Sequence, residues 1–217
     1  MDLVPLATHA AGENLAVFGA FHPGPADGLP EDIRTLVLLG PAEPGFWPHL
    51  NASPEMQDGL PDPIDRWSSR VISKLAEDLG GKAYFPFGGA PYHPFYSWAL
   101  RSGRAWAAPV RFLVHDTAGL YASYRGAIGF PDALELPATP AKSPCDACAD
   151  KPCLTACPPG ALGANGYNVP ACHQFLDKSA GKDCLSFGCA VRRACPLSQA
   201  YGRLPEQSAY HMGLFHK

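Results

Sequence analysis

The hydrophobic and polar positions in the first half of the chain predict one buried strand and one amphipathic helix with clear boundaries. Residues 35–40 form a continuous apolar run that ends at a Gly-Pro pair, which is typical of a buried strand. Residues 63–79 carry apolar side chains at helical spacing. Asp62 suits the N-cap of this helix and Pro63 its first turn, so we expect the helix to run from there to the Gly-Gly pair that follows it.

Further elements are predicted before residue 130. Residues 83–87 are short and aromatic and contain a proline, which favours an edge strand because proline cannot donate to a ladder. Residues 94–106 predict a second helix. Residues 110–115 and 120–128 are strand-like runs on either side of a turn with glycine, the pattern of a hairpin. Together these elements predict an α+β fold with a mixed or antiparallel sheet and flanking helices.

A Pro-rich stretch over residues 134–142 divides the chain. We therefore expect a first domain over residues 1–138 and a small second domain over residues 139–217. The second domain is too polar and too rich in Gly and Pro for a large apolar core, and bound metal can supply the missing cohesion. Its last segment, residues 205–217, predicts a helix that docks back on the first domain and shares one face among Tyr210, His211 and Leu214.

Composition and charge exclude two classes of partner. The net charge is −3 with 17 Lys and Arg residues, so no electrostatic footprint for nucleic acid is present. Arg192 and Arg193 are the one local basic pair, which we expect to be solvated. No apolar run approaches the length of a membrane span, and no secretory leader follows Met1, so we expect a cytoplasmic protein without membrane contact.

All eight cysteines lie between residues 145 and 195. Thiolates are soft ligands, and eight of them are sufficient for two [4Fe–4S] clusters. A proline follows both Cys157 and Cys195, and in two-cluster ferredoxins the cysteine before such a proline ligates the other cluster.

This rule predicts two sets of four ligands. The first set comprises Cys145, Cys148, Cys153 and Cys195. The second set comprises Cys157, Cys172, Cys184 and Cys189, with spacings longer than the usual ones. Structural zinc and disulfides are the alternatives. Zinc sites favour a second C-x2-C pair, which this chain lacks, and disulfides need an oxidising compartment.

Two segments before the cysteines resemble a known family. Residues 99–106 (ALRSGRAW) and 111–126 are similar to the cobalamin-binding region of epoxyqueuosine reductases, and the predicted hairpin also looks like the cobalamin-processing protein CblC. The resemblance implies a nitroreductase-like first domain that binds cobalamin base-off. It also implies a ferredoxin-like second domain that reduces the corrin.

The chain departs from epoxyqueuosine reductases at their catalytic aspartate. The matching stretch here is residues 87–91 (FGGAP), and no Asp or Glu occurs between Asp78 and Asp116. A general acid must lie within hydrogen-bond reach of the atom it protonates. We therefore reject tRNA modification, identify no catalytic residue, and leave open whether the protein is an enzyme.

The resemblance and the clustered aromatic residues predict which side chains would contact the corrin. They are His115, Tyr121, Tyr124, Arg125, Tyr92, Tyr96 and Trp106. The structural alternatives are a half-buried turn histidine, ordinary aromatic core packing and a surface ion pair for the arginine. On a regular strand, Tyr121 and Tyr124 would point to opposite faces.

These observations predict an iron–sulfur redox protein that binds cobalamin and reduces or processes it, by reductive removal of an upper ligand or by reactivation of the corrin. Its expected partners are an external electron-donor protein and cobalamin or a corrinoid protein. A ferredoxin-type electron carrier without corrin is one alternative, and a flavin-dependent reductase is another.

Overall fold

The structure is a computed structural model that describes residues 2–217, and its chain forms two compact units. The first unit comprises Met1–Ala105 and Ser123–Ala141, and the second comprises Trp106–Ala122 and Lys142–Lys217. The segment Trp106–Ala122 thus packs with the cysteine-rich part of the chain, although the Pro-rich stretch follows it by about a dozen residues.

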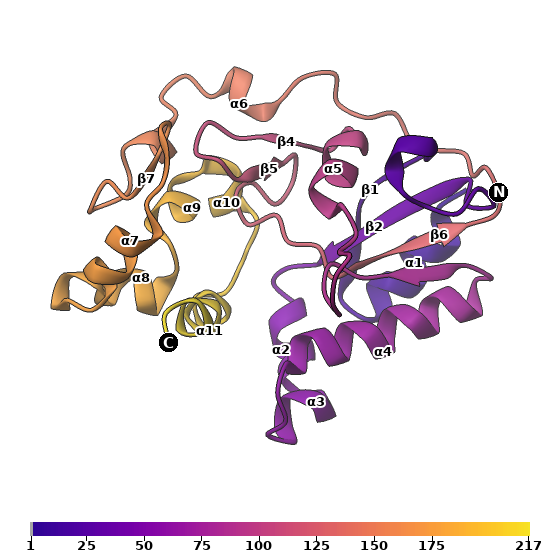
Figure 1. Ribbon diagram of the computed structural model, residues 1–217, viewed down its shortest axis with the longest axis horizontal. Helices are drawn as coiled ribbons and strands as arrows, with labels where there is room; N and C mark the ends of the chain where they lie inside the picture. Colours follow the sequence, from indigo (N-terminus) through magenta and orange to yellow (C-terminus); the bar gives the residue numbers. More distant parts are fainter. Residues whose placement is uncertain (1) are drawn as a thin grey trace. The chain divides into compact units, whose positions relative to one another are not determined.

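A four-stranded antiparallel sheet forms the centre of the first unit (Figure 1). In spatial order its strands are β1 (Leu15–Phe21), β2 (Thr35–Pro41), β6 (Gly126–Phe130) and β3 (Lys82–Tyr84). All residues of β2 and β6 are buried, as expected of central strands. The predicted strand over residues 35–40 is confirmed, and the predicted edge strand is present as the shorter β3.

Helices flank this sheet. They are α1 (Val4–Gly12), the 3-10 turn η1 (Pro25–Asp27), α2 (Phe46–Asn51), α3 (Pro54–Gln57), α4 (Pro63–Asp78) and α5 (Phe95–Arg101). The sequence prediction of α4 is confirmed, and its apolar stripe, including Trp67 and Ile72, is buried where the helix lies along β3 and β6. Burying each such side chain stabilises the fold by about 1.5–3 kcal/mol. Asp62 occupies the N-cap position in a left-handed conformation, and its side chain does not cap the helix.

The predicted hairpin over residues 110–128 is wrong. The strand β5 (Leu113–His115) pairs with β4 (Ala105–Ala107), whereas β6 pairs with β2 and β3. Only a local turn remains, closed by reciprocal backbone hydrogen bonds of 2.9 and 3.0 Å between His115 and Gly119. The alternation of side chains specifies a strand but not its partner, so sequence proximity favoured the wrong pairing.

The predicted helix over residues 94–106 is shorter than expected. It is α5, which ends at Arg101, and Gly103 with φ of 70° then turns the chain into β4. Glycine adopts this left-handed conformation without the steric cost that other residues meet.

The second unit consists of short elements. They are α6 (Pro144–Ala147), η2 (Pro152–Leu154), β7 (Leu162–Gly163), β8 (Gly166–Tyr167), α7 (Val169–Leu176), η3 (Ser179–Gly181), α8 (Lys182–Phe187), α9 (Ala190–Ala194), α10 (Pro196–Ala200) and α11 (Pro205–Phe215). The C-terminal helix is present as α11, which packs on α8 within this unit. Gln207 and Ser208 are its buried residues, whereas Leu214 is exposed. Among the described residues, no helix combines the length and the apolar character needed to cross a membrane.

Candidate functional site

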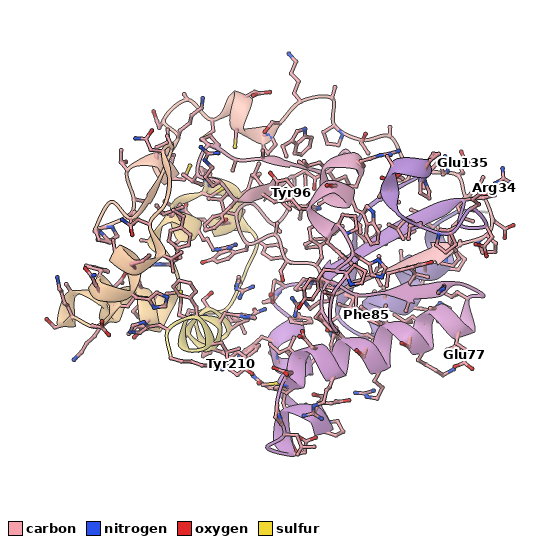
Figure 2. All side chains as sticks on the ribbon, in the orientation of Figure 1. Arg34, Glu77, Phe85, Tyr96, Glu135 and Tyr210 are labelled. Carbon is pink, nitrogen blue, oxygen red and sulfur yellow. The ribbon has the colours of Figure 1, made fainter. Side chains whose placement is uncertain are left out.

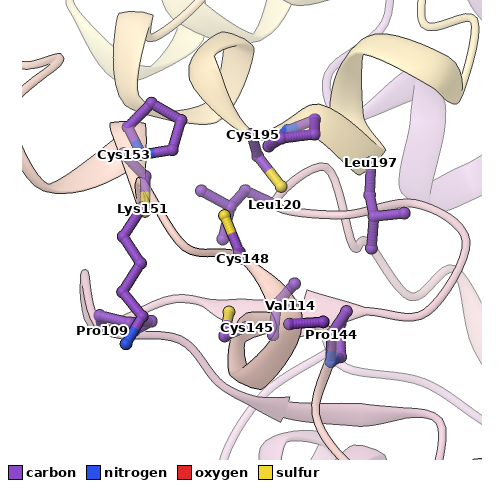
Figure 3. Close-up of a pocket in the computed structure, with 13 residues that line it drawn as sticks. Pro109, Val114, Leu120, Pro144, Cys145, Cys148, Lys151, Cys153, Cys195 and Leu197 are labelled. Atoms are coloured by element: carbon purple, nitrogen blue, oxygen red, sulfur yellow. The ribbon is translucent and has the colours of Figure 1, made fainter.

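The four cysteines of the first set line one cavity in the second unit (Figure 3). Its volume is about 370 Å³. Apart from Lys151 and the cysteines, its lining is apolar and comprises Pro109, Val114, Leu120, Pro144, Ala147, Pro152, Pro196 and Leu197. Figure 3 shows the sulfur atoms of Cys145, Cys148 and Cys195 turned toward a common space. Thiols from three separate stretches of chain therefore meet at one apolar cavity.

Local backbone features place these side chains. Ser143 is the N-cap of α6, and its Oγ accepts a hydrogen bond of 3.2 Å from the backbone N–H of Cys145. Cys148 follows the same helix in an extended conformation. Cys195 is also extended, with φ of −69° and ψ of 126°, because Pro196 disfavours a helical residue before it. Cys195 therefore leaves the path of α9 at the point where α10 begins.

The thiols of the first set interact with one another. Burial raises the pKa of the Cys145 thiol, whereas its hydrogen bond with Ser143 lowers that pKa. The nearby Cys195 and Cys148 raise it further. Burial also raises the pKa of Cys153, with further increases from Cys145, Cys195 and Cys148. The four side chains are thus close enough to oppose each other's ionisation, and a bound metal would compensate the charge of the thiolates.

Three cysteines of the second set, Cys157, Cys172 and Cys189, lie near Tyr167 at the end of β8. Burial raises the pKa of the Tyr167 phenol well above its usual range. A side-chain hydrogen bond with Cys172 and the negative charges of Cys172, Cys189 and Cys157 raise this pKa further. Burial also raises the pKa of Cys184, and the charge of Cys189 contributes to the increase. The members of the second set come from the turn after η2, from α7, from α8 and from the N-cap of α9.

Each of these thiol–thiol interactions joins members of the same predicted set. In the described part of the chain, no group of three or more His, Cys, Asp or Glu side chains converges in an arrangement for a metal ion. The first set nevertheless lines one cavity, and the interactions of the second set run among its own cysteines and Tyr167.

One apolar cluster packs against both sets. Its buried members are Ala108, Val110, Val114, Leu120, Cys153, Leu162 and Val191. Cys145 and Cys195 of the first set pack on it, and so do Cys157 and Cys189 of the second. The backbone N–H of Leu162 also donates a 3.4 Å hydrogen bond to the Cys157 sulfur. Both thiol sets therefore share one water-excluding core.

Arg192 is a site residue that the sequence analysis misjudged. Its guanidinium lies 4.1 Å from the centre of the Phe112 ring and donates a hydrogen bond to the Leu120 carbonyl. Arg193, in contrast, pairs with the exposed Asp183. The expectation of a solvated arginine pair is wrong for Arg192. Its place three residues after Cys189, the N-cap of α9, was the available signal.

His115 is completely buried. Its Nδ1 accepts hydrogen bonds from the backbone N–H groups of Thr117 at 3.1 Å and Ala118 at 3.3 Å. A nitrogen that accepts these bonds carries no proton, so the 3.2 Å approach of the Asp116 carboxylate is not a salt bridge. The contacts of His115 stabilise the turn after β5.

The other expected corrin contacts are divided between the two units. Trp106 and Tyr121 belong to the second unit with His115, whereas Tyr92, Tyr96, Tyr124 and Arg125 belong to the first. Tyr121 is buried in the second unit, with the Arg203 guanidinium 5.1 Å from its ring centre. Neither Tyr121 nor Tyr124 lies in a strand, so the predicted strand over residues 120–128 begins only after both of them, at Gly126.

The contacts in the first unit differ in exposure. Tyr124 is buried edge-on against Phe18, with ring centres 6.0 Å apart, and Arg125 lies 4.0 Å from the Asp65 carboxylate. Tyr92 and Tyr96, in contrast, are 65% and 51% exposed. Figure 2 labels Tyr96, which belongs to α5. These two tyrosines are the expected contacts available to a ligand on the surface of the first unit.

No protein-family model, curated protein or solved structure matches this chain.

Proposed function

We propose that this protein is an iron–sulfur electron-transfer protein whose second unit holds two [4Fe–4S] clusters. The observation that carries the proposal is the cavity at which Cys145, Cys148, Cys153 and Cys195 meet. The sequence rule for cysteines followed by proline assigns the same four residues to one cluster. The cysteines around Tyr167 would hold the second cluster.

The chemistry of the donor set fits such clusters. Four thiolates are the usual ligands of a [4Fe–4S] cluster, which when bound accepts and donates single electrons. A single zinc ion would draw four sulfurs to within about 4 Å of one another, since each Zn–S bond is about 2.3 Å. The cavity that the four cysteines help to line has a volume of about 370 Å³, which leaves room for a larger, polynuclear group. Its apolar lining would exclude water from that group.

We further propose that the electrons, delivered by an external donor protein, go to cobalamin or a corrinoid protein. The resemblance of residues 99–106 and 111–126 to cobalamin-binding reductases supports this acceptor. The exposed Tyr92 and Tyr96 support it as well, because aromatic side chains suit the faces of large flat cofactors. The task would be removal of an upper ligand or reactivation of the corrin. In this proposal the first unit is nitroreductase-like and the second ferredoxin-like.

An anaerobic EPR titration tests both levels of the proposal. The purified protein is assayed for iron and sulfide, reduced with dithionite, and titrated with cob(II)alamin. We expect about eight iron and eight sulfide per chain, reduced cluster signals, and conversion of cob(II)alamin to its base-off form. Clusters with an unchanged base-on signal would leave a ferredoxin-type carrier without corrin. Bound zinc, or no metal at all, would contradict the iron–sulfur proposal.

Cysteine variants provide the internal control for the assignment to sets. Cys148→Ser and Cys153→Ser should abolish the same EPR signal, because both belong to the first set. Cys172→Ser should abolish the other signal and leave the first. A different grouping would contradict the assignment of ligands.

A further inference from the structure

Arg192 links the neighbourhoods of the two thiol sets. It lies on α9, between Cys189 of the second set and Cys195 of the first. Its guanidinium donates to the carbonyl of Leu120, a residue that lines the first cavity. The same group lies over Phe112, whose ring meets Tyr167 edge-on with centres 6.3 Å apart. Contacts from one guanidinium therefore reach both sites.

The environment of this cation is apolar. Phe112 packs against the shared cluster, and Val191, the residue before Arg192, is a fully buried member of it. Burial lowers the pKa of Arg192, and the negative charge of a Cys189 thiolate opposes that decrease. Asp183, the nearby carboxylate, pairs with Arg193 instead. An arginine keeps its charge in proteins, and charge interactions are stronger where water is excluded.

We propose that Arg192 sets the reduction potential of the second cluster, which the proposed function assigns to the cysteines around Tyr167. Reduction adds one electron and makes the cluster and its thiolates more negative. A nearby positive charge stabilises that state, so Arg192 raises the potential. Electrons supplied to the protein by a low-potential donor would then favour the second cluster over the first. In this proposal Arg192 acts only through its positive charge and is not a ligand of the cluster.

The test is an anaerobic redox titration followed by EPR. Arg192→Met removes the charge and keeps an unbranched apolar stem that can lie on Phe112. We expect the ratio of reduced to oxidised second cluster at a fixed potential to fall about tenfold, which is about 59 mV for a one-electron couple. The second-cluster signal is identified as the one lost in Cys172→Ser. Arg192→Lys, which keeps the charge, should restore most of the wild-type potential.

Lys178→Met is the matched control, because it removes one positive charge from an exposed position of the same unit. Its potentials should equal those of wild type, since exposed charges are screened by water and salt. Equal shifts in Arg192→Met and Lys178→Met, or an unchanged potential in Arg192→Met, would overturn the proposal. If the Arg192→Met protein does not assemble both clusters, the Arg192→Lys protein provides the test. Wild-type cluster assembly and potential in Arg192→Lys would support the role of the charge. Failure of Arg192→Lys to assemble both clusters would overturn the proposal. A wild-type protein without clusters would instead refute the proposed function itself.

Discussion

Two carboxylates in the first unit are buried, and each meets an arginine. Asp27 is 3% exposed, and its Oδ2 accepts hydrogen bonds from Arg101 at 2.6 Å and from the backbone N–H of Gly24 at 2.7 Å. Glu55 accepts two hydrogen bonds from Arg70, at 2.5 and 3.0 Å. Burial of a charge is tolerated when hydrogen bonds and an opposite charge compensate it. These pairs tie η1 to α5 and α3 to α4.

The Glu55 pair predicts a pH dependence of stability. The hydrogen bond from Arg70 is the main reason that the pKa of Glu55 falls from 4.5 to about 2. Because the folded-state pKa is lower, the pair stabilises the fold above the unfolded pKa and loses this contribution as the pH falls toward 2. We expect Glu55→Gln to lower the free energy of unfolding at pH 7 by about 1 kcal/mol, since Arg70 is partly exposed to solvent. Urea unfolding followed by tryptophan fluorescence measures the difference.

The exposed Glu31 supplies the control for this experiment. Glu31→Gln should leave the free energy of unfolding nearly unchanged at pH 7. The deficit of Glu55→Gln should shrink between pH 4.5 and pH 2. A deficit that is the same at pH 7 and pH 3 would contradict the ion-pair explanation.

At the scale of elements, prolines mark where many helices begin. A proline lies in the first turn of α1, α3, α4, α6, α7, α10 and α11. Proline is favoured there because its fixed φ suits the helix and its missing N–H is not needed. Before α10, this preference also places Cys195 at the first cavity. Pro196 therefore both begins α10 and holds the adjacent Cys195 in an extended conformation.

The packing of α11 on α8 depends on Gly188. This residue follows α8 with φ of 89° and ψ of 169°, a conformation that is nearly exclusive to glycine. A Cβ atom there would lie 2.7 Å from the Cβ of Ser208 on α11. We expect Gly188→Ala to lower the free energy of unfolding by about 1–3 kcal/mol. Thermal or denaturant unfolding measures this effect, and iron content should fall because Cys189 is the next residue.

Gly213, on the same α11, is the matched control. A Cβ atom there would have no neighbour within 4 Å. Gly213→Ala should therefore raise stability by about 0.5–1 kcal/mol, as alanine does in helices. Equal effects of the two substitutions would contradict the packing argument.

At the scale of the whole molecule, the two units differ in what holds them together. The first has a four-stranded sheet with fully buried central strands. The second has two-residue strands, short helices and a core in which cysteines are prominent. A unit of this kind would gain much of its stability from the metal that we propose its cysteines bind.

Removal of the proposed clusters should therefore unfold the second unit selectively. After anaerobic treatment with an iron chelator, we expect amide hydrogen exchange to accelerate over Lys142–Lys217 and Trp106–Ala122. The amides of β2, β6 and α4 should keep their protection. Mass spectrometry of deuterium uptake measures both, with iron-saturated chelator as the control. Unchanged protection in the second unit would contradict a structural role of the clusters.

The local hydrophobic pattern correctly predicted the elements that have a continuous or periodic set of apolar residues. The strand β2 is a continuous apolar run, and α4 has a complete apolar stripe bounded by Pro63 and the Gly80-Gly81 pair. The ligand sets were predicted from the cysteine–proline pairs. The four cysteines of the first set line one cavity, and Cys157, Cys172 and Cys189 of the second lie near Tyr167, while the assignment to clusters stays a prediction. The hairpin prediction failed because a strand pattern encodes one buried face and does not encode which strand will pair with it.

The sequence by itself determined where the long, periodic elements lie and that all eight thiols belong to one segment of the chain. Only the tertiary structure decided that β6 joins β2 and β3, and that Trp106–Ala122 packs with the cysteines. It also decided that Arg192 lies on Phe112 while Arg193 faces Asp183. The physical reason is that periodicity records whether a side chain is buried, whereas its partners are chosen by packing between segments far apart in sequence.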